Sequence, residues 1–341
     1  MGEVIIIGLD LAKSVFQAHG ADASGAVIFR KKLRREQVAA FFAKQPACIV
    51  AMEACASAHY WAREIAALGH ETRLIPPAYV KPFVKRQKND MADAEAICEA
   101  AQRPTMRFVA VKSAEAQAAT VVFRTRDLLV RQRTRLINAL RGHMAEFGIV
   151  VRQGVGHVAK LIDFILDPCS DLPQEGRQIL ALLVQSLQQL QVQIGVLDAE
   201  IAARAKTNST ARRLMTIPGI GPIGATALVA LAPPAHTFKR GRDFAAWMGL
   251  TPLQHSSGGK ERLGKTTKMG ERSLRRLLIL GASSTVKAAT RKPPAPGSWL
   301  GRMLARKPRM LVIVALANRM ARIVWALMAH GGTYRAPAVA A

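Results

Sequence analysis

The chain has 341 residues, half of them hydrophobic, which excludes a largely disordered protein and suffices for two or three domains with a buried core. Its 49 lysines and arginines outnumber 23 acidic residues, giving a formal net charge of +26. Such an excess predicts a polyanionic partner, with nucleic acid as the leading candidate. The four cysteines form neither a CxxC pair nor a zinc pattern, so disulfide and zinc scaffolds are excluded and a reducing cytoplasm is expected.

The positive charge is concentrated at the carboxy-terminal end. Residues 206–341 contain 23 basic and only three acidic residues, a net charge of +20. This segment is therefore predicted to form a phosphate-binding surface. A carboxylate-rich metal site would have to lie in the amino-terminal half.

The first hundred residues have the pattern of an α/β domain. Strands are predicted first as an antiparallel meander and then singly between helices, at 4–9, 15–20, 26–32, 48–52 and 72–75. Helices are predicted at 35–44, 58–68 and 89–102.

Two long helices are predicted in the middle of the chain, at 114–147 and 175–205. The second has apolar residues near heptad spacing, which is typical of a coiled coil or dimer element, but an ordinary intramolecular hairpin is an equal alternative. The start of the chain lacks the pattern of a signal peptide. Two apolar stretches, 214–232 and 310–329, are interrupted by prolines or by Asn318, Arg319 and Arg322, so both are predicted to be core helices rather than membrane spans.

Four carboxylates occur where strands and a helix meet. Asp10 ends the first strand, Glu53 ends the fourth, and Asp90 and Asp93 lie on one face of the following helix. If the first and fourth strands are neighbours, the four side chains would share a pocket that selects Mg²⁺ or Mn²⁺. The alternative is that each carboxylate caps a helix or lies on a solvated face. An actin-like sugar kinase, which also begins with an aspartate after a strand, ranks lower because no glycine-rich adenosine-binding segment follows.

Two loops of the basic segment are candidates for contact with phosphates. The turn containing Gly219 and Gly221 is similar to the hairpin of helix-hairpin-helix proteins, although a simple packing turn is an equal alternative. Ser256 and Ser257 precede Gly258-Gly259-Lys260 and would present a hydroxyl among cations. From composition alone, a loop that only grips the nucleic-acid backbone is favoured. The candidate nucleic-acid-binding residues are Gly219, Gly221, Lys260, Arg262, Lys265, Lys268, Arg272, Arg275 and Arg276.

Five ordered blocks together resemble a known family. They are Gly8-Leu9-Asp10-Leu11-Ala12-Lys13, Met52-Glu53-Ala54-Cys55, Lys88-Asn89-Asp90-Met91-Ala92-Asp93-Ala94, Pro218-Gly219-Ile220-Gly221-Pro222 and Ser256-Ser257-Gly258-Gly259-Lys260. The set, which covers nearly the whole chain, resembles the DEDD transposases of bridge-RNA-guided insertion sequences.

The resemblance implies three regions: a RuvC-like domain with an RNase H fold (1–150), a coiled-coil region (151–205) and a mainly α-helical transposase domain (206–335). It implies that Asp10, Glu53, Asp90 and Asp93 bind Mg²⁺ and that Ser257 attacks DNA to give a phosphoserine intermediate. It further implies a structured guide RNA paired with donor and target DNA, a homodimer that assembles to a tetramer with composite sites, and a cytoplasmic, nucleoid-associated location in bacteria.

Two other functions fit the same residues. A metal-dependent junction nuclease would cut DNA with the carboxylates and use Ser257 only to bind phosphate. A non-catalytic scaffold would bind nucleic acid with the carboxylates in a structural role.

Overall fold

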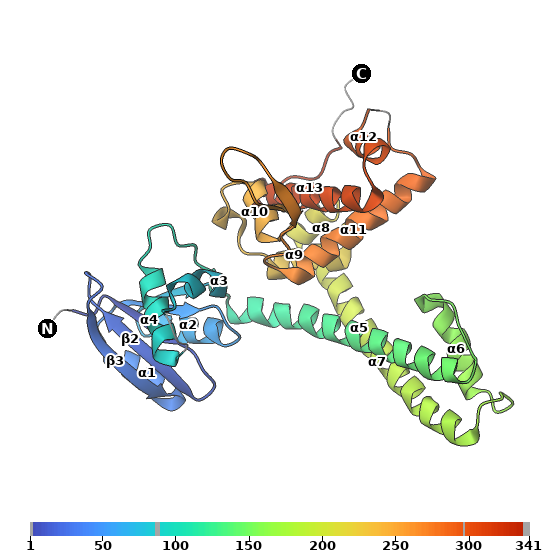
Figure 1. The fold of residues 1–341 in the computed structure, drawn as a ribbon, viewed down its shortest axis with the longest axis horizontal. Helices are drawn as coiled ribbons and strands as arrows, with labels where there is room; N and C mark the ends of the chain where they lie inside the picture. The colour runs from blue at the N-terminus through green and yellow to red at the C-terminus, as the bar shows by residue number, and fades with distance from the viewer. Residues whose placement is uncertain (1–2, 86–88, 296, 337–341) are drawn as a thin grey trace. The chain divides into compact units, whose positions relative to one another are not determined.

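The computed structural model describes residues 3–85, 89–295 and 297–336 (Figure 1). The chain divides into two compact units, Met1–Ala118 and Ala119–Ala341, and the division falls inside the long helix α5 (Ala114–Glu146). The five strands expected in the amino-terminal part and the long helices expected in the middle are all present, with ends that differ by one or two residues from the predicted ranges.

The first unit is built on a mixed five-stranded sheet in the order β3-β2-β1-β4-β5. The strands are β1 (Ile6–Asp10), β2 (Val15–Ala21), β3 (Val27–Arg34), β4 (Ile49–Glu53) and β5 (Glu71–Ile75). The first three pair antiparallel, whereas β1, β4 and β5 are parallel. The predicted meander is therefore confirmed. The first and fourth strands are neighbours, which was the condition for their terminal carboxylates to lie near each other.

Helices cover both faces of this sheet. One apolar core lies against α1 (Val38–Phe42) and α2 (Ala58–Ala67), and a second lies against α4 (Asp90–Ala101). Short helical segments occur at η1 (Arg35–Gln37), α3 (Pro77–Val80) and η2 (Lys81–Phe83). The single helix predicted at 35–44 is wrong in detail, because a 3-10 turn precedes the short α1.

A glycine in the first strand sets the distance between α4 and the sheet. A Cβ atom on Gly8 would lie 2.2 Å from the carbonyl oxygen of Ala94 and 2.6 Å from the backbone nitrogen of Cys98, both in α4. Glycine in a strand interior commonly marks such a close approach of two backbones. The contact brings the start of α4 against the end of β1, where Asp10 lies.

The middle of the chain forms a helical subregion of the second unit. Buried residues of α5, α6 (Val158–Leu166) and α7 (Gln174–Thr207) share one core that includes Leu140, Ile165 and Leu187. Arg126 of α5 also pairs with Asp198 of α7 at 2.5 Å. The two long helices are therefore joined within the chain, and a coiled coil between subunits stays a prediction.

The rest of the second unit is mainly helical around one large apolar core. Its elements are α8 (Ser209–Leu214), α9 (Pro222–Leu231), η4 (Ala235–Thr237), α10 (Gly241–Trp247), β6 (Pro252–Gln254), β7 (Leu263–Thr266), α11 (Arg272–Arg291), α12 (Trp299–Arg306) and α13 (Arg309–His330). The short η3 (Val155–His157) belongs to the middle subregion, where it precedes α6. Strands β6 and β7 form an antiparallel hairpin.

Two of the described helices, α7 and α13, are long and apolar enough to cross a membrane by length and composition. Core helices of soluble proteins pass the same test, so this is weak evidence for a membrane span. One side of α13 packs into the large core through residues such as Val312, Met320 and Val324.

Candidate functional site

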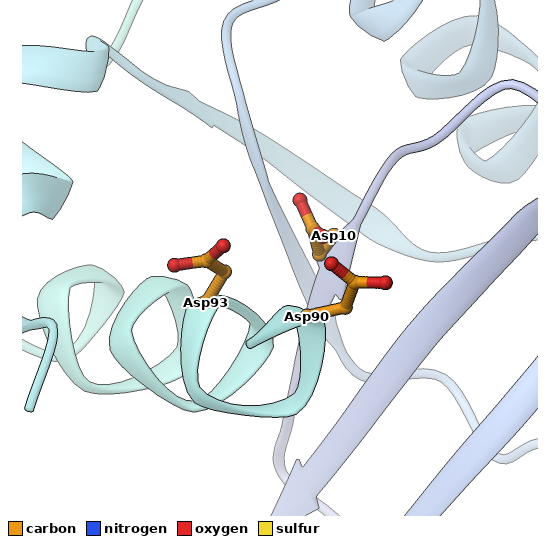
Figure 2. A group of neighbouring side chains, drawn as sticks. All are labelled: Asp10, Asp90 and Asp93. Carbon is orange, nitrogen blue, oxygen red and sulfur yellow. The ribbon is translucent and has the colours of Figure 1, made fainter. Parts of the chain in front are cut away.

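Three of the four predicted carboxylates converge at the edge between β1 and α4. Asp10 is the last residue of β1, and Asp90 and Asp93 lie in the first turn of α4. One carboxylate oxygen from each lies within 4.8 Å of the others. Figure 2 shows the three side chains directed toward one another.

The start of α4 is capped by a neighbour rather than by these aspartates. The Asn89 side-chain oxygen accepts a hydrogen bond from the backbone N–H of Ala92 at 2.8 Å. Asparagine is a preferred N-cap residue because its short side chain reaches such a free N–H group. Asp90 is therefore not the helix cap, although it does lie in the first turn of the helix, where an acidic residue is favourable. The sequence analysis missed Asn89, although its position directly before Asp90 was a readable signal. Lys88, the first residue of the same motif, lies outside the described residues.

The cluster perturbs the ionisation of Asp10. Burial, followed by the charges of Asp93, Asp90 and Glu53, raises the pKa of Asp10 from 3.8 to about 6. Glu53 ends β4, the parallel neighbour of β1, so its charge acts on Asp10 although it is not one of the three converging groups. Glu53 ends its strand as expected, but a pocket shared by all four carboxylates stays a prediction.

The residues present suit a divalent cation. Several carboxylates held this close repel one another unless positive charge neutralises them, and carboxylate oxygens are the ligands that Mg²⁺ and Mn²⁺ prefer. Asp10, Asp90 and Asp93 would supply the nearest oxygens.

Asp10→Asn is expected to stabilise the metal-free protein at pH 7. The folded pKa of about 6 exceeds the ordinary value of 3.8, so the ionised group costs stability above pH 6 and the cost fades as the pH falls toward 3.8. Since Asp10 is partly solvated, we expect a gain of about 1 kcal/mol.

Urea unfolding in EDTA at pH 7 and at pH 4 measures this difference. The gain should be present at pH 7 and absent at pH 4, and Mg²⁺ should raise the melting temperature of the wild type but not of Asp10→Asn. A variant that is less stable than the wild type at pH 7 in EDTA would contradict the repulsion between these groups.

The serine loop is the tip of the β6-β7 hairpin. The backbone N–H of Lys260 donates to the carbonyl oxygen of Ser257 at 3.1 Å, across Gly258 and Gly259, whose φ angles are +55° and +76°. Positive φ at both central positions favours glycine and produces a tight reversal. All residues of this turn are exposed.

The two serines of the loop differ in their bonding. The Ser256 hydroxyl accepts a hydrogen bond from the backbone N–H of Arg262 at 3.1 Å. Among the described residues, no hydrogen bond involves the Ser257 hydroxyl, which lies exposed beside the glycine turn. The difference distinguishes two adjacent serines that the sequence alone could not separate.

The predicted cations around this hairpin have different environments. Lys260, Arg262, Lys265, Lys268 and Arg272 are exposed. Arg275 is buried, and its Nη1 donates to the carbonyl oxygens of Met248 and Met269, both at 2.9 Å. Arg276 is exposed and pairs with Asp127 of α5. Arg275 therefore braces the base of the hairpin, while the exposed residues stay candidates for phosphate contact.

The two glycines of the 217–222 turn also differ. Gly219 has a φ of +89°, and a Cβ atom there would lie 2.5 Å from the carbonyl oxygen of Gly281 in α11. This glycine is required where two backbones cross, which supports the packing alternative. Gly221 has open space around it and immediately precedes α9.

Two known protein families match separate parts of the chain. The family described as "Transposase IS116/IS110/IS902 family" matches residues 211–295, and the IS110 DEDD transposase family matches residues 7–149.

Relatives match over almost the whole length. A "Probable family 20 transposase" of Pseudomonas aeruginosa is 49% identical over 96% of this chain and 98% of its own. The transposases of IS1328 from Yersinia enterocolitica and IS1111A from Coxiella burnetii are 39% and 38% identical, each over 98% of this chain and over 99% and 92% of their own lengths. The chain therefore belongs to the IS110/IS116 family of DEDD transposases, enzymes that cleave DNA strands and transfer them.

Proposed function

We propose that this transposase is an RNA-guided recombinase that cuts donor and target DNA by attack of Ser257 and holds the cut end as a phosphoserine. The observation that carries the proposal is the presence, in one chain, of the Asp10, Asp90 and Asp93 cluster and an exposed Ser257 hydroxyl on a cation-rich hairpin. A nuclease that cut DNA with the carboxylates alone would need Ser257 only to bind phosphate, so its cleavage would survive loss of the Ser257 hydroxyl.

The acidic cluster is the metal-binding half of the proposal. Asp10, Glu53, Asp90 and Asp93 would hold Mg²⁺, or Mn²⁺ in its place. When bound, the ion would neutralise charge that develops on a phosphodiester oxygen as its ester bond breaks. The sheet order β3-β2-β1-β4-β5, with three antiparallel strands followed by parallel ones, supports the RuvC-like RNase H fold that the family resemblance implies.

Ser257 would form the covalent bond. Its Oγ attacks the phosphorus, one strand ester bond breaks, the serine proton passes to solvent, and the departing strand leaves with a free hydroxyl group. Exposed Lys260 and Arg262 lie within a few residues of Ser257 and would stabilise the negative charge of the transition state. Rejoining reverses these steps with the hydroxyl group of another strand.

The positive charge of the chain and its family suggest which partners it binds. The basic segment 206–341 would hold the backbones of donor DNA, target DNA and a structured guide (bridge) RNA. Base pairing would supply sequence choice, as in other RNA-guided proteins. We further propose a homodimer that assembles to a tetramer in which Ser257 of one subunit acts with the carboxylates of another, working at the nucleoid in the bacterial cytoplasm.

The domain division is part of the same proposal. Regions 1–150, 151–205 and 206–335 would be the RuvC-like domain, the coiled-coil region and the transposase domain. The elements of the last region include the serine hairpin and the turn at Gly219 and Gly221.

Asp90→Asn tests the metal-dependent half. With guide RNA, labelled DNA and Mg²⁺, strand cleavage on denaturing gels is expected to fall at least about a hundredfold, because one ligand of the cluster loses its charge. The matched control is Glu99→Gln, another acidic residue of α4 that pairs with Arg103 rather than joining the cluster. Cleavage that persists in Asp90→Asn would contradict the role of the cluster, and cleavage that needs no RNA would contradict RNA guidance.

A further inference from the structure

The second unit contains a large open groove that the serine site does not include. Its volume is about 1210 Å³, and its walls come from α10, α13 and the base of the β6-β7 hairpin. Lys265 and Thr266 of β7 line it, so it borders the strands that carry the Ser257 turn at their tip.

The groove has a consistently positive lining. Five cations line it: Arg240, Arg242, Lys265, Arg319 and Arg322. No aspartate or glutamate does, and among the residues that the structure describes none of the five forms an ion pair. Such a surface attracts phosphates.

One face of α13 gives the groove an apolar part as well. Met310, Leu311 and Val314 lie in the first half of the helix, and Arg319 and Arg322 line the same groove from its second half. Met310 and Leu311 are 64% and 50% exposed, so the groove presents apolar surface beside its cations.

Tryptophan adds a flat surface. Of the four tryptophans in the chain, Trp299 and Trp325 both line the groove, and the Arg319 guanidinium lies 4.9 Å from the centre of the Trp299 ring. Aromatic and guanidinium planes of this kind stack with nucleobases.

The walls are fixed before any ligand arrives. The side-chain nitrogen of Asn318 donates to the carbonyl oxygen of Leu250 at 3.1 Å, and Trp325 Nε1 donates to the carbonyl oxygen of Ala235 at 3.1 Å. Helix α10 meets α13 so closely that a Cβ atom on Gly241 would lie 3.0 Å from the carbonyl oxygen of Arg322. A fixed groove lowers the ordering cost of binding.

We infer that this groove binds an unpaired nucleic-acid segment, with phosphates on the arginines and bases on the Trp299 and Met310 side. An intact duplex offers phosphates but keeps its base faces stacked, so it would not use the apolar part. The inference rests on the proposed function, since it gives a strand of the DNA or of the guide RNA a path past the base of the serine hairpin.

Fluorescence anisotropy of the full-length protein in EDTA tests the groove. The probes are a fluorescein-labelled single-stranded DNA, the RNA of the same sequence, and the DNA duplex. The variant Arg240→Ala with Arg322→Ala removes two exposed groove cations, and the matched control Lys287→Ala with Arg291→Ala removes two exposed cations of α11 outside the groove.

We expect the groove variant to bind single strands at least about tenfold more weakly, and the slope of log K against log salt to fall by about 1.4, the value for two lost contacts on a single strand. In the control variant, both the single-strand affinity and the salt slope should change less than in the groove variant. Whichever single strand loses more affinity, DNA or RNA, is the natural occupant. Trp299→Leu should weaken single-strand binding and leave duplex binding unchanged.

Three results would overturn the inference: equal losses in the groove and control variants, an equal loss for duplex, or variant-sensitive binding to anionic lipid vesicles with unchanged oligonucleotide affinity. This test is separate from that of the proposed function, because binding is measured in EDTA and involves no cleavage. Its result therefore does not depend on whether the carboxylates or Ser257 act as proposed.

Discussion

Ser257→Ala is expected to abolish the covalent protein–DNA adduct. With guide RNA, labelled DNA and Mg²⁺, the protease-sensitive shifted band of the wild type should fall by about a thousandfold or more, because alanine has no oxygen to form the ester. DNA binding in EDTA should be unchanged, since the Ser257 side chain makes no hydrogen bond within the described residues that its loss would disturb.

Ser256→Ala is the matched control for this result. It removes the hydroxyl that accepts from Arg262, so it should loosen the hairpin and lower the yield of adduct several-fold without eliminating it. Free cleaved ends that persist in Ser257→Ala would identify a metal-dependent nuclease instead. An adduct lost in Ser256→Ala and kept in Ser257→Ala would reassign the nucleophile.

Gly8→Ala is expected to disrupt the acidic cluster without changing any carboxylate. The new methyl group would meet the backbone of Ala94 and Cys98 at distances that no side-chain rotation can relieve, so α4 must move away from β1. Overpacking of this kind costs about 1–3 kcal/mol, and here it also displaces Asp90 and Asp93 from Asp10. Urea unfolding should show the loss, and Mg²⁺ should no longer raise the melting temperature.

Gly142→Ala is the control for this substitution. Gly142 is an exposed residue in α5 with open space around its Cβ position, so alanine should stabilise the helix by about 0.5–1 kcal/mol. A Gly8→Ala protein with wild-type stability and a wild-type response to Mg²⁺ would contradict the tight packing of α4 against the first strand.

The amino-terminal fold was predictable because its signals are local. Short apolar runs separated by turns indicated the strands, and the end of each strand indicated where its carboxylate would lie. Asp10, Asp90 and Asp93 meet because α4 packs across β1, and Glu53 acts on Asp10 because β4 neighbours β1. The sequence analysis could only assume the pairing of β1 with β4, and it did not recognise Gly8 as the signal for the close packing of α4.

The basic segment was less predictable because its arginines look alike in sequence. Arg275 and Arg276 are adjacent in sequence, yet Arg275 is buried at the base of the hairpin, whereas Arg276 is exposed and pairs with Asp127 of α5. The sequence around Gly219 is similar to a phosphate-binding turn, but in the structure Gly219 packs against the backbone of α11 at Gly281. The groove cations come from α10, β7 and α13, and only tertiary packing brings them to one surface. Their spacing of three residues in α13 indicates that Arg319 and Arg322 lie on one side of the helix, but nothing in the sequence indicated which elements pack beside that side.

Mass spectrometry of the trapped adduct tests the central claim most directly. Trypsin cleavage after Arg242 and Lys260 gives one peptide that contains both Ser256 and Ser257. After nuclease digestion of the bound DNA, fragment ions should place a nucleotide phosphate on Ser257, in a reaction that requires Mg²⁺ and the guide RNA. Cleaved DNA with this peptide unmodified, or with the phosphate on Ser256, would contradict the phosphoserine mechanism at Ser257.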